Sequence, residues 1–203
     1  MIPAPEEISS LAVASRRSPV QEHHIDFLLE EEFAASPGFL TFVLGAASEH
    51  CGESWEAGLP AASSQPNCSS IRSVTTDQGE TDVLVIYKST EVFGRVAILI
   101  EDKIRAGFQP NQAERYRMRG KEGTSSGEWD HFWTCLIAPE RYADNNEGSD
   151  ARVSLETLRS FFCAEDARTK FKAGVLDRAL HRLSRPDCKR KTKPLPGSKL
   201  LCA

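Results

Sequence analysis

The residues with the clearest chemical potential are Glu101, Asp102 and Lys103, which directly follow an apolar run at 96–100. Such a run predicts a strand that is covered on both faces of a sheet. Since side chains alternate along a strand, Glu101 and Lys103 should share one face, and Asp102 should point to the other. The sequence therefore predicts a charged cluster at the end of a buried strand.

A strand predicted over 81–88 should form a hairpin with this buried strand, predicted over 95–104, because only a short link separates them. When the hairpin is folded about the middle of its loop, Asp82 lies opposite Glu101. In the same register Glu80 lies opposite residue 103. Three acids and a lysine should therefore collect at one end of a central hairpin.

Carboxylates held within a few ångströms of each other repel unless a cation lies between them. Oxygen ligands of this kind favour Mg²⁺ or Mn²⁺. Such a metal lowers the pKa of a bound water and neutralises charge on a phosphodiester, and the ammonium of Lys103 could stabilise an attacking hydroxide. The alternative is an ion-paired strand end in solvent, which an E-x-K tripeptide alone does not exclude.

A helix predicted over 110–119 begins with proline and stops at Gly120. It carries Gln112 and Tyr116 four residues apart, and hence on one face. Gln112 falls in the first turn, where amide donors and the positive end of the helix dipole favour a phosphate or a metal-bound water. We expect this face to point toward the acids.

Three motifs together resemble the PD-(D/E)XK nuclease superfamily, in particular its RecB-like branch. They are Gly79-Glu80-Thr81-Asp82, Ile100-Glu101-Asp102-Lys103 and Gln112-x-x-x-Tyr116. The resemblance covers roughly residues 25–183. It implies a restriction-endonuclease-like αβββαβ core and a magnesium-dependent hydrolysis of DNA.

The resemblance also implies roles for single residues. Asp82 and Glu101 would hold Mg²⁺ (or Mn²⁺), Lys103 would assist the attacking water, and Gln112 and Tyr116 would complete the catalytic set. An acid of the first helix often completes such sites, and Glu32 is chosen over its two acidic neighbours. The predicted contacts to nucleic acid are Arg105, Arg115 and Arg119.

Apolar periodicity and capping signals predict the other elements. Helices are expected over 20–33, from Ser36 onward, and over 155–163 and 164–183; strands are expected over 71–75 and 129–138. This order predicts an α/β fold with a mixed central sheet of about four strands flanked by helices. Trp129, Phe132 and Trp133 are interpreted as core residues in preference to base-stacking ones.

The composition fits one domain: 203 residues, 40% hydrophobic, with a formal net charge of -4. Residues 20–185 should form the nuclease-like domain, between a flexible segment at 1–19 and a disordered basic tail at 186–203. No apolar run is long enough to cross a bilayer and no signal peptide is recognisable, so we expect a cytoplasmic protein without a membrane partner.

The six cysteines show no paired spacing, which argues against a disulfide framework. A zinc site at His50, Cys51 and Cys68 is the weaker alternative for metal binding. The leading hypothesis is a DNA nuclease, endo or exo, with RNA as the alternative substrate. The competing hypothesis is a catalytically inactive, truncated nuclease-fold protein that binds nucleic acid as an accessory; the sequence predicts no oligomeric state.

Overall fold

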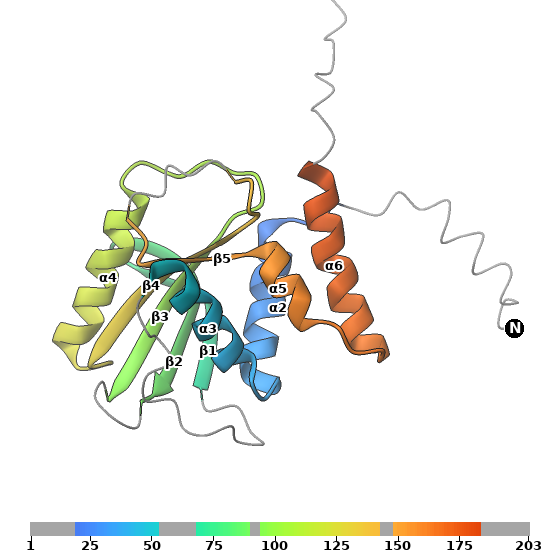
Figure 1. Cartoon of the computed structure of the whole chain (residues 1–203). Coiled ribbons are helices and arrows are strands. Elements are labelled where there is room, and N and C mark those ends of the chain that lie inside the picture. The colour runs from blue at the N-terminus through green and yellow to red at the C-terminus, as the bar shows by residue number, and fades with distance from the viewer. Residues whose placement is uncertain (1–18, 53–67, 90–93, 143–147, 184–203) are drawn as a thin grey trace, which may run out of the picture.

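The computed structural model describes residues 19–52, 68–89, 94–142 and 148–183 (Figure 1). The helices are α2 (Glu22–Ala35), α3 (Phe39–Cys51), α4 (Gln112–Ser126), α5 (Leu155–Phe161) and α6 (Ala167–Leu183). The strands are β1 (Cys68–Thr76), β2 (Gly79–Lys88), β3 (Arg95–Asp102), β4 (His131–Ala138) and β5 (Ala151–Ser154). The predicted N-terminal segment, apart from its last residue, and the predicted basic tail lie outside the described residues.

The strands form one mixed sheet in the order β1-β2-β3-β4-β5. The first two pairings are antiparallel, and the pairings of β3 with β4 and of β4 with β5 are parallel. The predicted α/β class with a mixed, helix-flanked sheet is confirmed, with five strands instead of about four. The strand that the sequence did not reveal is β5, whose four residues are too short for a periodic signal.

Helices cover both faces of this sheet, as the consecutive apolar residues of β3 require (Figure 1). Helices α2, α3, α5 and α6 enclose the larger core, which contains Ile98 and Ile100 of β3. Helix α4 covers the opposite face, where Leu99 packs with Tyr116 and Trp129. Any side chain at the end of β3 therefore enters a partly dry environment on either face.

The predicted hairpin register is confirmed along most of β2 and β3. Val83 pairs with Ile100, and the same offset continues to the pairing of Lys88 with Arg95. One step beyond this ladder, an oxygen of the Asp82 carboxylate (Oδ2) accepts a hydrogen bond from the backbone nitrogen of Asp102 at 3.0 Å. The two strands are thus tied together at the point where the acids begin.

Helix α4 differs from its prediction at both ends, since it begins at Gln112 and runs through Gly120 to Ser126. The glycines inside it serve packing. A Cβ at Gly120 would lie 2.2 Å from the Phe132 ring, and one at Gly123 would lie 1.9 Å from the Trp129 ring. Glycine here lets α4 approach β4 closely, which outweighs its low helix propensity.

None of the helices among the described residues is both long and apolar enough to cross a membrane. The longest of them, α6, carries charged residues through most of its length.

Replacing Gly123 by Ala should destabilise the protein by about 1–3 kcal/mol, because the added methyl group overlaps the Trp129 ring. That ring cannot move freely, since its indole nitrogen donates to the Gly120 carbonyl at 2.9 Å. Urea denaturation would measure the loss. In Gly174→Ala of α6, the new methyl group would meet only the end of Arg178 at 3.5 Å, and stability should rise by about 0.5–1 kcal/mol.

Candidate metal centre

Three aspartates from three different elements meet at one end of the sheet. Asp102 is the last residue of β3, Asp82 lies in β2, and Asp26 lies in the second turn of α2. One carboxylate oxygen of each lies within 4.8 Å of the other two. Asp26 and Asp102 are buried and Asp82 is half-buried. These three residues, called the acid cluster below, are the arrangement best suited to hold a metal ion among the described residues.

The alternation of β3 explains how the acid cluster forms. Asp102 shares a face with Ile98 and Ile100, and α2 packs on that face. Asp26 projects from α2 toward the same core, beside Leu29 one turn later, and meets Asp102 there. The cluster thus depends on α2 crossing the end of the sheet at a fixed point.

The acid cluster has too few donors for its buried oxygens. Within the described ranges, no group donates a hydrogen bond to either carboxylate oxygen of Asp102 or to Oδ1 of Asp26. Burial, the contact with Asp26 and the charge of Asp82 together raise the pKa of Asp102 well above its usual value. Burial, followed by the charge of Glu101, raises the pKa of Asp82 to about 7. A divalent cation would relieve both the desolvation and the repulsion.

Glu101 and Lys103 lie on the other face of the strand end, as alternation predicted, and they form an ion pair. Glu101, predicted as a metal ligand together with Asp82, is therefore the partner of Lys103 and is not one of the three residues of the acid cluster. Lys103 is only 8% exposed. Burial lowers the pKa of Lys103, but the hydrogen bond and charge of Glu101, with smaller contributions from Glu22 and Asp82, outweigh it and raise this pKa overall. The lysine is therefore a fixed cation beside the acids.

Glu80 is not the partner of this lysine. It is exposed on β2, where it pairs with Thr75 of β1, and the ladder between β2 and β3 ends at Val83. The predicted position of Glu80 opposite Lys103 therefore does not appear in the strand pairing.

Tyr116 links the hairpin strands to α4, on the face that the sequence assigned to the site. Its hydroxyl donates to the Ile100 carbonyl at 3.3 Å and accepts from the backbone nitrogen of Asp82 at 3.2 Å. Burial, with the charges of Glu101 and Asp82, raises the pKa of Tyr116 well above its usual value, so the hydroxyl keeps its proton. Tyr116 positions the backbone that carries the acids.

Gln112 is buried in the first turn of α4, and its side-chain oxygen accepts from the backbone nitrogen of Gln109 at 3.0 Å. This contact stabilises the turn that leads into the helix. The structure thus brings Tyr116 to the site, and it gives the Gln112 oxygen a structural bond instead of a contact with the acids.

Glu32, the acid chosen from the first helix, does not reach the acid cluster. It is 1% exposed and pairs with Lys172 and Arg168 of α6, the latter at 2.9 Å. Asp26 and Glu32 are six residues apart, which separates them by about 9 Å along a helix and places them on different faces. The acid that α2 contributes to the cluster is Asp26. Its signal in the sequence was a carboxylate in register with Leu29 and Phe33 on an otherwise apolar stripe.

The three predicted arginine contacts occupy different environments. Arg105 is exposed just beyond the site, and Arg115 is half-buried and donates to Gln109 and to the Pro110 carbonyl. Arg119 is only 4% exposed, with its guanidinium carbon 4.1 Å from the centroid of the Tyr116 ring. Because Arg119 is three residues after Tyr116, it faces the sheet, and it is not a surface contact.

The alternative zinc site is not assembled either. The Cys68 thiol donates to the Phe33 carbonyl and the Cys51 thiol to the Ser48 carbonyl. In the part of the chain that the structure describes, the one group of three or more potential ligands close enough to share an ion is the acid cluster.

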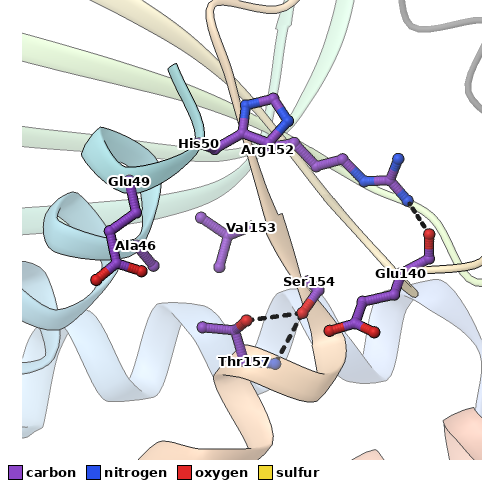
Figure 2. A pocket seen from close by; sticks show the side chains of 8 residues that line it. All are labelled: Ala46, Glu49, His50, Glu140, Arg152, Val153, Ser154 and Thr157. Atoms are coloured by element: carbon purple, nitrogen blue, oxygen red, sulfur yellow. Dashed lines mark hydrogen bonds between the residues drawn. The ribbon is translucent and has the colours of Figure 1, made fainter. Parts of the chain in front are cut away.

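Figure 2 shows a hollow elsewhere, bounded by α3, β5 and α5. Some of its polar side chains have structural partners. Ser154 accepts from the Thr157 nitrogen at the start of α5, and Arg152 donates to the carbonyls of Pro139 and Glu140 (Figure 2). These bonds hold the start of α5 and the chain that follows β4.

Comparisons with protein-family models, with curated proteins and with solved structures give no match to this chain. The functional argument therefore depends on the residues of the site and on their geometry.

Mn²⁺ should bind the wild-type chain, and Asp82→Asn and Asp102→Asn should each weaken binding about tenfold or more, because each removes a ligand charge. Calorimetric titration would measure the affinities. Glu32→Gln is the matched control, since Glu32 is a buried acid held by cations of α6, and its affinity should stay at the wild-type value. Unchanged Mn²⁺ affinity in both aspartate variants would exclude the acid cluster as the metal centre.

The metal-free protein should lose stability as pH rises from about 4 to 7. The pKa of Asp82 lies near 7 in the folded state against an ordinary value of 3.8, so the native state binds more protons than the unfolded state in this window. The slope should be on the order of 1 kcal/mol per pH unit. Thermal unfolding in EDTA would show it, and Asp82→Asn should flatten the slope. A wild-type slope equal to that of Asp82→Asn would contradict the assignment.

Proposed function

We propose that this protein is a metal-dependent phosphodiesterase that hydrolyses DNA. The observation that carries the proposal is the meeting of three carboxylates, two of them with unbonded buried oxygens, beside a buried lysine at one end of a sheet. Carboxylates beside an ammonium suit phosphoryl chemistry, in which charge must be neutralised on both the attacking and the leaving oxygens. The resemblance of the three sequence motifs to PD-(D/E)XK nucleases supports the same reaction.

Asp82, Asp102 and Asp26 would hold Mg²⁺ or Mn²⁺, which would supply Lewis-acid polarisation of the scissile phosphate. Glu101 keeps Lys103 charged and fixed in direction by their ion pair. The ammonium of Lys103 can then orient a water molecule and stabilise negative charge as it develops on the phosphate.

Tyr116 contributes by position. Its hydroxyl bonds both strands of the hairpin, so the Asp82 carboxylate is presented from a fixed backbone. A preorganised charge stabilises a transition state most strongly where water is excluded. Asp102 and Lys103 are both buried, so water is largely excluded from this end of the sheet.

The direct test is incubation of the full chain with linear, circular and single-stranded DNA, and with RNA, in Mg²⁺, Mn²⁺ or EDTA. Cleavage should require the metal and should be absent in EDTA. Binding of DNA without cleavage in either metal would replace this proposal by the accessory, nucleic-acid-binding function.

Lys103→Met should leave Mn²⁺ binding intact and slow single-turnover cleavage by about 10²-fold or more, because it removes a charge aimed at the transition state and no ligand. Quenched-flow or gel assays at saturating enzyme would measure the rate. Lys121→Met, at an exposed lysine of α4, is the control and should cleave at the wild-type rate. If Lys103→Met cleaves as fast as this control, Lys103 is only the ion-pair partner of Glu101.

A further inference from the structure

The pairing of the edge strand β1 with β2 is interrupted at one point beside the acid cluster. Ser73 of β1 and Asp82 of β2 are opposite each other by position, and the otherwise continuous ladder skips both of them. Ser73 has a φ of 53°, and it is the one non-glycine residue of the described strands with a positive φ. Interruptions of this kind on an edge strand change the direction in which side chains point.

The edge strand β1 changes face at Ser73. Arg72 and Val74 are two residues apart, so regular alternation would place both side chains on one face of the sheet. Arg72 instead pairs with Glu30 of α2, whereas Val74 packs in the cluster beneath α4. The left-handed residue between them therefore marks the position at which the alternation of β1 is broken.

Strand β2 changes face at the matching position. Thr81 and Val83 should also share a face. Val83 lies in the core on the α2 side, but Thr81 pairs with Val74 and lines a cavity beneath α4 together with Leu84. The residue at which β2 breaks its alternation is therefore Asp82.

This break explains how Asp82 reaches the acid cluster. Counted from Leu84, alternation would place its side chain on the α4 face. Instead, one carboxylate oxygen lies within 4.8 Å of oxygens of Asp26 and Asp102, and Oδ2 accepts from the Asp102 nitrogen at 3.0 Å. The backbone nitrogen of Asp82 donates to the Tyr116 hydroxyl at 3.2 Å. Asp82 thus has these bonds toward β3 and α4 at the point where its pairing with β1 is interrupted.

We propose that the left-handed backbone of Ser73 turns Asp82 toward Asp26 and Asp102, so that Ser73 is a positioning residue for cation binding. A positive φ is uncommon for any residue other than glycine and is strongly disfavoured for a β-branched one. Strained backbone of this kind persists where the surrounding structure fixes it, and it concentrates at functional sites. The inference rests on the candidate metal centre of the proposed function, and it does not require DNA cleavage.

The test is calorimetric titration of the full chain with Mn²⁺, using substitutions of Ser73 that differ in their tolerance of a positive φ. Ser73→Val and Ser73→Thr should each weaken binding about tenfold or more, because both residues are β-branched. Ser73→Gly should bind within about twofold of the wild type, because glycine adopts this conformation freely. Threonine keeps the hydroxyl, so a loss in Ser73→Thr is an effect of the backbone.

Ser69→Val is the matched control, because Ser69 is an exposed serine of the same strand in a regular pair with Ile86. Its Mn²⁺ affinity should equal that of the wild type. Urea denaturation in EDTA separates positioning from stability. A merely structural role would lower the free energy of unfolding of Ser73→Val and leave the Mn²⁺ affinity of the folded protein unchanged.

Unchanged Mn²⁺ affinity in folded Ser73→Val, or an equal loss in Ser73→Gly, would overturn the proposal. If circular dichroism shows that Ser73→Val does not fold, the Ser73→Thr result decides the question. A wild-type chain that binds no Mn²⁺ would overturn the metal centre together with this proposal, whereas wild-type binding that Ser73→Val retains would overturn this proposal alone.

Discussion

The constraint on which the structure depends is the approach of Asp26, Asp82 and Asp102 in a place with little water. Like charges in a low dielectric repel strongly, and desolvation adds to the cost, which is why the pKa values of Asp82 and Asp102 are raised. The cost follows from the fold itself: β3 is central and covered on both faces, so any residue that ends it is buried. A cation would turn this destabilising arrangement into a binding site.

Helix α2 is held by its other acids, and this isolates Asp26. Glu22 accepts from the backbone nitrogens of 104–106, and Glu30 pairs with Arg72 of β1. Glu31 and Glu32 pair with Arg168 and Lys172 of α6. The helix is thereby fixed at its start, along its length and at its end. These ion pairs involve the other acids of α2, whereas Asp26 lies in the acid cluster with two further carboxylates. The same contacts that anchor α2 therefore present its uncompensated acid to the end of β3.

Sequence patterns within one element or one hairpin predicted the structure where contacts between neighbouring residues determine it. The apolar run of β3 and the length of the hairpin loop predicted the offset between β2 and β3 that the structure has. They did not predict that Asp102 joins Asp82 in the acid cluster, because strand alternation alone points Asp102 to the face opposite Glu101. The choice of Glu32 over its two acidic neighbours did not consider Asp26. Which acid of α2 reaches the cluster depends on where this helix crosses the sheet, and α2 is held by ion pairs with α6, far along the chain. Helix α4 continues beyond Gly120, where the sequence predicted its end, because a glycine at this position leaves room for the Phe132 ring of β4. Helix propensity describes single residues and does not include such a contact with another element. Strand β5 is held by its pairing with β4, which its own four residues do not reveal.

Tyr116 connects the end of the sheet that carries the acids to helix α4. Its hydroxyl bonds the backbone of β2 and β3 next to the acids, while its ring lies against the guanidinium of Arg119. One buried side chain thus contacts both strand ends and a buried cation of α4. Because the hydroxyl keeps its proton, it can donate to Ile100 while it accepts from Asp82, and both bonds persist across the pH range in which Asp82 titrates. The backbone that carries Asp82 therefore stays tied to β3 and α4 whether the Asp82 carboxylate is charged or neutral.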